Sequence, residues 1–218
     1  MSIAIKRFNK PMTDFSLDRR KFLTRSLIVA GAILIPVNAR CREIREMNGD
    51  VFVSGQRADA ATAIKSGDNI ITGGDGQVTF TVGKDGFMVR PDTVLELETG
   101  DGAIIKGLRL VTGALLAVFG KGGYREIMTD TAVIGIRGTG LYLDVKPERT
   151  YFCTCYGKTT ITDAEHSLDI SSRHHEAYNI TFNDTGVMTM KATEVIGHTD
   201  QELRQLESYF GRKPPFDT

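Results

Sequence analysis

The chain has 218 residues, 41% of them hydrophobic, with 27 basic and 27 acidic side chains. Seven basic and two acidic side chains fall within residues 1–39, so residues 40–218 hold 20 basic against 25 acidic ones, a formal charge of −5. A mildly acidic domain without a basic stripe does not attract phosphate backbones, so nucleic acid is excluded as an expected partner. Residues 40–218 suit one domain with a core of its own.

An apolar stretch near the start of the chain predicts a signal peptide. The uncharged residues 26–37 follow a basic segment, and Val37-Asn38-Ala39 has the small-residue pattern of a cleavage site. A spanning helix needs about 20 apolar residues, so this stretch is too short for a permanent anchor. We therefore expect residues 1–39 to be a signal peptide that is cleaved after Ala39.

The pair Arg19-Arg20, followed by Phe22 and Leu23, resembles the twin-arginine signal of bacteria. It departs from that pattern in having Asp18 before the pair and Thr24 at its end. The resemblance implies export of the folded protein by the twin-arginine translocase and a periplasmic location. Replacing both arginines by lysine should therefore keep the precursor in the cytoplasm, and normal export of that variant would contradict the prediction.

Cys41 lies two residues past the expected cut. It could carry a lipid anchor, but Arg40 stands where a lipoprotein signal requires a small residue, so we expect a free thiol.

Residues 44–195 read as many short strands separated by turns. Residues 77–82 alternate between polar and apolar, which predicts a half-exposed strand with Val78, Phe80 and Val82 buried; residues 93–98 repeat the pattern with Leu95 and Leu97 inward. Asn-Gly and Asp-Gly pairs predict tight turns at residues 48–49, 75–76, 85–86 and 101–102. The spacing indicates a single all-β domain, and we expect a solenoid or twisted β-roll.

The last part of the chain, residues 196–218, predicts one short amphipathic helix and a tail. Thr199 and Glu202 form a capping-box pattern, and Leu203, Leu206 and Phe210 make one apolar stripe. Gly211 can close the helix, and the prolines that follow prevent its continuation. We expect residues 199–210 to pack on the β domain through this stripe.

Taken together, segments spread over residues 49–163 resemble a FecR-type domain. The most specific of them is residues 129–139, Thr-Asp-Thr-Ala-Val-Ile-Gly-Ile-Arg-Gly-Thr. Other matching segments are Gly49–Val53 with Gly55-Gln56, Ile64–Gly73, Gly76–Phe80, Arg90–Thr93 and Leu110–Leu116.

The resemblance implies a periplasmic β-rich module that receives a signal or binds a partner, which could be a protein, a glycan or a small ligand. Regulators of that family carry an anti-sigma segment and a membrane helix before the domain, and neither is expected in this chain.

Arg137, Gly138 and Thr139 within that segment allow two interpretations. Arg137 could contact an anion. Alternatively, Gly135 and Gly138 allow close backbone approach while Arg137 braces a turn, which is the interpretation we favour because single motifs often mislead.

A thiol pair and nearby histidines are the one set of residues that could hold a metal. Cys153 and Cys155 read as part of a strand that ends near residues 156–157, and alternate strand residues share a face, so both thiols should point the same way. Their Cα atoms would lie about 6.6 Å apart, which makes a disulfide strained. With His174 or His175, of which only one should face the thiols, they could form part of a zinc or other soft-metal site, and His198 lies farther on.

Residue patterns of the common enzymes are absent from the sequence, including the metalloprotease, serine-hydrolase and P-loop motifs. We therefore expect a non-enzymatic binding or sensing module. The alternative is a small periplasmic metal-binding or redox protein that uses the two cysteines and a histidine. Two further outcomes stay open for the cysteines, a strained disulfide or two thiols without a role.

Overall fold

The computed structural model describes residues 43–98, 106–162, 167–182 and 188–218. The expected signal peptide, Cys41 and the predicted turn at residues 101–102 lie outside these ranges. The described residues belong to one unit, which spans residues 37–218. Within it, neither helix is long and apolar enough to cross a bilayer.

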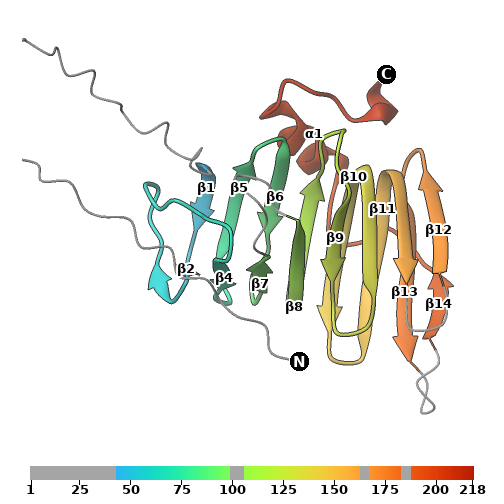
Figure 1. The fold of residues 1–218 in the computed structure, drawn as a ribbon, viewed down its shortest axis with the longest axis horizontal. Helices are drawn as coiled ribbons and strands as arrows, with labels where there is room; N and C mark the ends of the chain where they lie inside the picture. The colour runs from blue at the N-terminus through green and yellow to red at the C-terminus, as the bar shows by residue number, and fades with distance from the viewer. Residues whose placement is uncertain (1–42, 99–105, 163–166, 183–187) are drawn as a thin grey trace, which may run out of the picture. The chain divides into compact units, whose positions relative to one another are not determined.

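The described chain is mostly β-strand, with one α-helix near its end (Figure 1). The all-β class is therefore confirmed. The elements in chain order are β1 (Glu43–Asn48), β2 (Val51–Val53), β3 (Gln56–Arg57), β4 (Asn69–Thr72), β5 (Gln77–Val82), β6 (Asp85–Val89), β7 (Val94–Leu97), β8 (Gly107–Val118), β9 (Arg125–Met128), β10 (Val133–Lys146), β11 (Arg149–Thr162), β12 (Ser167–Ser172), β13 (Glu176–Phe182), β14 (Met188–Ala192), α1 (Asp200–Ser208) and the 3₁₀ turn η1 (Pro215–Asp217).

Three long strands, β8, β10 and β11, pass through two layers of the sheet. Each changes one of its neighbours along its length: β8 pairs with β7 and then β6, β10 with β9 and then β8, and β11 with β13 and then β12. In β8 the change comes at Gly113, whose φ of +86° and close approach to Thr93 leave no room for a side chain. Among the described strands, pairing is antiparallel except between β8 and β9, which fits the twisted roll better than a solenoid of parallel coils.

Two apolar clusters result from this folding of the sheet. The inner cluster lies between the layers and takes residues from both, for example Phe80 and Leu115 from one and Leu95 and Ile134 from the other. The outer cluster lies on the far face of β6, β8, β10 and β11, beneath α1 and the C-terminal tail.

The C-terminal helix follows the sequence prediction closely. Both halves of the capping box between Thr199 and Glu202 are present, and Leu203 and Leu206 are fully buried. Gly211 has a φ of +65°, as the predicted helix end requires. The apolar stripe therefore packs in the outer cluster against β6 and β8.

Three local predictions were wrong. Strand β5 is buried on both faces, because Thr79 pairs with Met88 in the region that α1 covers. Asp85-Gly86 lies inside β6, and the turn comes earlier, at Gly83. Strand β11 continues past Gly157 to Thr162, because its second half pairs with β12.

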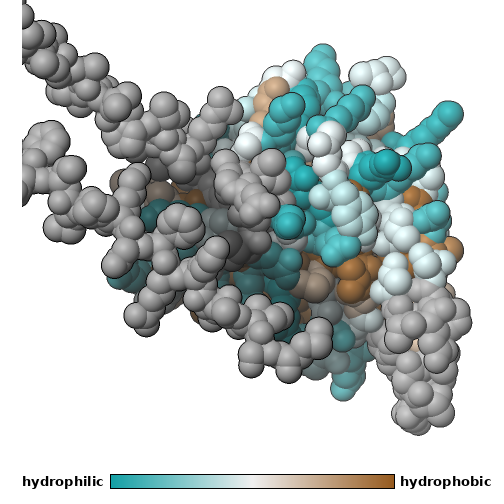
Figure 2. All heavy atoms as spheres, in the orientation of Figure 1, coloured by the Kyte–Doolittle hydropathy of each residue, from teal (hydrophilic) through white to brown (hydrophobic). Residues whose placement is uncertain are grey.

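The surface of the described chain is mainly hydrophilic in the view of Figure 2, with scattered apolar patches. Its exposed large apolar side chains come from separate strands and connections: Ile71, Tyr124, Leu168, Val195 and Ile196.

Candidate metal centre

The two thiols lie on the outer face of β11, as the two-residue period of a strand predicts. Cys153 and Cys155 have no measurable exposure and are both free thiols. Two histidine rings lie against them, those of His175 and His198. The four donor atoms, two sulfurs and two nitrogens, all lie within 4.8 Å of one another.

His175 reaches the thiols because of the way two strands share β11. Strand β12 pairs with the second half of β11 and β13 with the first half, so the connection between them passes beside Cys155. The backbone N–H of His175 donates to the Cys155 carbonyl at 2.9 Å. His175 also has a φ of +54°, an uncommon conformation for a residue other than glycine, which local contacts must maintain.

His174, in contrast, does not face the thiols. Its Nε2 lies 3.0 Å from Asp200 Oδ1, and its side chain is half exposed. His174 and His175 are adjacent, and the structure brings only the second one to the cluster.

His198 is the fourth member of the cluster. The sequence showed this histidine farther along the chain but did not assign it to the site. Its Nε2 lies 3.2 Å from Cys155 Sγ and 3.3 Å from His175 Nδ1. One feature of the sequence could have suggested that His198 lies near the sheet. It directly precedes the capping box of a helix that was expected to pack on the sheet. Spacing alone could not show where along the sheet that helix lies.

Three of the six distances between donor atoms are close to those of a tetrahedral site, and all six are within 4.8 Å. Zinc bonds of about 2.0–2.1 Å to nitrogen and about 2.3 Å to sulfur place neighbouring donors about 3.3–3.8 Å apart. The separation is 3.3 Å between the two nitrogens and 3.6 Å between Cys153 Sγ and His175 Nδ1. The 3.2 Å between Cys155 and His198 is slightly shorter. Thiolate and imidazole ligands favour zinc or another soft metal.

Each histidine is held by its other ring nitrogen. His175 Nε2 lies 2.8 Å from Asp200 Oδ1, and His198 Nδ1 lies 2.9 Å from the Ile196 carbonyl oxygen. Metal-binding histidines almost always donate this second N–H to a carboxylate or a carbonyl, which fixes the ring and raises its basicity. The cluster therefore has the outer hydrogen bonds of a metal site as well as its ligands.

The pKa values of the two thiols are shifted in opposite directions. A hydrogen bond from Cys155 lowers the pKa of Cys153 to about 4, with further help from His175 and His198 and against the effect of burial. Burial and the neighbouring Cys153 raise the pKa of Cys155 well above its usual range. The hydrogen bond to Cys153 raises the pKa of His175. Since metals bind thiolates, the lowered pKa of Cys153 favours metal binding at this sulfur.

Asp200 remains an acceptor for both neighbouring rings. Burial would raise the pKa of its carboxyl, but hydrogen bonds from His175 and His174 outweigh burial and lower it. The carboxylate is therefore suited to orient His175.

The segment around Arg137 forms a separate feature on the other layer. Thr139 is buried, and its hydroxyl donates to the Lys158 carbonyl at 2.8 Å and accepts from the Lys158 N–H at 3.1 Å, across an irregularity in the pairing of β10 and β11. Arg137 is exposed and lines a depression of about 720 Å³ with Lys158 and Tyr124. Gly138 and Thr139 therefore shape the strand, and Arg137 points to solvent.

The fold is similar to that of a solved bacterial protein. Two crystal structures of a "putative anti-sigma factor" from Parabacteroides distasonis ATCC 8503 match at TM-scores of 0.50 and 0.48, with 14% and 15% sequence identity. The matches cover 58% and 57% of this chain, and the chain spans about 60% and 58% of the length of those structures.

No protein-family model and no curated protein matches the chain. The structural likeness at a TM-score of 0.50 concerns the fold alone. It supports the part of the FecR-type resemblance that concerns the fold.

Proposed function

We propose that this chain is a non-enzymatic sensing module that binds a soft divalent metal, with zinc preferred, through Cys153, Cys155, His175 and His198. The observation that carries the proposal is the convergence of four donor atoms within 4.8 Å of one another, from three buried residues and the partly buried His175. Four protein ligands leave no open position for a substrate or a reactive water, which is the arrangement of structural and regulatory zinc sites. This supports a binding role over a catalytic one.

The sensing part of the proposal is supported by the fold. The solved protein with the similar fold is described as a "putative anti-sigma factor", a class of regulator. We propose a corresponding role in signalling for this chain, in the periplasm after export. In this proposal the metal is the small ligand that the module binds, and a periplasmic protein receives the signal.

Metal analysis of the purified full-length protein tests the proposal. We expect about one equivalent of zinc per chain after purification with zinc, and the visible absorption of tetrahedral thiolate coordination after replacement by cobalt. Cys153→Ser and His198→Ala should each lower zinc affinity by more than tenfold. Asp200→Asn should lower it by about 10–100-fold, the usual effect of losing an outer hydrogen bond.

Two matched variants provide controls. His174→Ala removes the adjacent imidazole that does not face the thiols, and Cys41→Ser removes the remaining cysteine; neither should change the zinc content. A protein that binds no zinc with both thiols reduced would contradict the proposal. A Cys153–Cys155 disulfide that a thiol reductant opens and an oxidant forms again, in protein that binds no zinc when reduced, would favour the redox alternative. A pull-down from periplasm with the zinc-loaded protein tests the partner.

A further inference from the structure

The C-terminal segment, residues 193–218, contributes directly to the metal centre. Residues 193–197 run exposed over the domain, and then His198 is buried, with 7% of its surface exposed. An exposed connection that places a single imidazole among two buried thiols is a specific contact rather than general packing.

The contact is shaped by the residues around His198. The ring stacks on Tyr142 at 4.7 Å between centroids and 18° between planes. Gly197 has a φ of +76°, and a β-carbon there would lie 2.4 Å from the Tyr142 hydroxyl oxygen. The chain therefore passes so close over Tyr142 that only glycine fits before His198.

The metal centre also includes the start of the helix. Asp200, the first residue of α1, accepts the hydrogen bond of His175 at 2.8 Å. One ligand and one orienting carboxylate thus come from the C-terminal segment, whereas the other three ligands come from β11 and the connection to β13.

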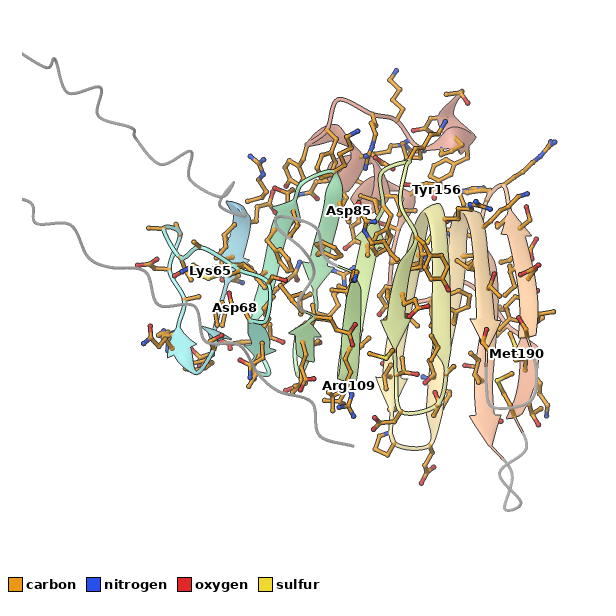
Figure 3. All side chains as sticks on the ribbon, in the orientation of Figure 1. Lys65, Asp68, Asp85, Arg109, Tyr156 and Met190 are labelled. Carbon is orange, nitrogen blue, oxygen red and sulfur yellow. The ribbon has the colours of Figure 1, made fainter. Side chains whose placement is uncertain are left out.

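The same segment covers the outer apolar cluster. Leu203 and Leu206 are fully buried in the cluster that holds Met88, Leu116 and Val118. Polar contacts hold the helix as well, among them the pair of Arg90 with Glu202 at 2.7 Å and the hydrogen bond that Tyr156 donates to the buried Glu207. Tyr156 lies midway along β11, and Figure 3 shows it at the upper edge of the sheet, next to this segment.

We infer that the metal acts as a latch, so that metal binding and docking of residues 193–218 on the sheet stabilise each other. The inference rests on the proposed metal site. Since His198 reaches the thiols only when the segment is docked, a metal that binds all four ligands stabilises the docked form over the undocked one. Loss of the metal weakens this docking, and the position of the segment then reports whether the metal is bound.

Linkage gives a test in which no ligand is changed. Because coupling is reciprocal, a substitution that populates the undocked form of the metal-free protein also weakens metal binding. Leu206→Ala removes buried contacts of α1, and we expect zinc affinity to fall on the order of tenfold. Leu115→Ala is the matched control: this leucine is equally buried but lies in the inner cluster, so zinc affinity should stay the same for the folded protein.

Hydrogen exchange of the full chain measures the latch directly. Zinc should slow exchange of the amides in residues 200–208 by at least about tenfold, and a chelator should restore it. In His198→Ala, zinc should no longer change helix exchange, whereas Cys41→Ser should behave as the unsubstituted chain.

The outcomes separate the two proposals. If one equivalent of zinc binds through the four ligands but neither helix exchange nor the Leu206→Ala affinity changes, the latch is wrong and the metal site stands. If no zinc binds, the metal site itself is wrong, and the latch with it.

Discussion

The two apolar clusters of this domain are held together by different kinds of contact. The inner cluster is made of aliphatic and phenyl side chains, such as Phe87, which stacks on Phe80 at 5.0 Å and meets the edge of Phe119 at 5.7 Å. The outer cluster mixes apolar side chains with tyrosines and with the two cysteines. Its aromatic members are Tyr142, Tyr151 and Tyr156.

The difference shows which cluster supports the fold and which carries chemistry. Burial of apolar surface is not directional, so the inner cluster needs only side chains of suitable volume. Thiols, imidazoles and hydroxyls need partners at defined positions when they are buried. The outer cluster therefore depends on the exact placement of the C-terminal segment, and the inner one does not. The following predictions test this contrast, in order of decreasing effect.

The largest effect should come from the inner cluster. Phe87→Ala should lower the free energy of unfolding by roughly 3–5 kcal/mol, because it removes a fully buried ring between two others. Urea unfolding with zinc and with chelator measures it, and the loss should be the same in both conditions. If the variant does not fold, Phe87→Leu should show a smaller loss with the same independence from zinc. A loss that depends strongly on zinc would mean that the two clusters are not separate.

Metal should act on the outer cluster. At free zinc 100-fold above its dissociation constant, the free energy of unfolding should rise by about 2.7 kcal/mol relative to the chelated protein. In Cys155→Ser this zinc-dependent increase should be lost, whereas Cys41→Ser should keep it. The measurement is paired urea unfolding of each variant with and without zinc. An equal increase in Cys155→Ser would show that zinc binds elsewhere.

A smaller effect is expected where α1 meets β11. Glu207 is buried, with 4% of its surface exposed, and it accepts a hydrogen bond from Tyr156. Tyr156→Phe should lower the free energy of unfolding by about 1–3 kcal/mol, since a buried carboxylate loses a partner. Tyr178→Phe is the matched control, because its bond to Glu176 is exposed at 3.4 Å, and it should cost less than about 0.5 kcal/mol. Equal losses in the two variants would contradict the importance of directional contacts in the outer cluster.

The smallest effect concerns the start of α1. Thr199→Ala removes the helix cap and should cost about 1 kcal/mol. Hydrogen exchange should show the change in residues 200–208 and leave the amides of β8 unaffected. Thr193→Ala, at an exposed position of the same segment, should change neither the free energy of unfolding nor the exchange of residues 200–208.

Much of the fold followed from local patterns. The alternation in residues 93–98 correctly placed Leu95 and Leu97 in the core, because a strand has a period of two whatever it packs against. The capping box and apolar stripe located α1 for the same reason, since both depend on contacts within a few residues. Strand β5 shows the limit of such patterns. Its alternation predicted one exposed face, but the fold covers both faces.

The candidate site shows the same division. The sequence by itself determined that Cys153 and Cys155 share a face, because that follows from strand geometry. Tertiary structure decided which histidines join them: the exchange of pairing partners along β11 brings in His175, and the docking of residues 193–218 brings in His198. These contacts join residues up to 43 positions apart, and their geometry depends on strand register and on helix docking, which no local periodicity contains.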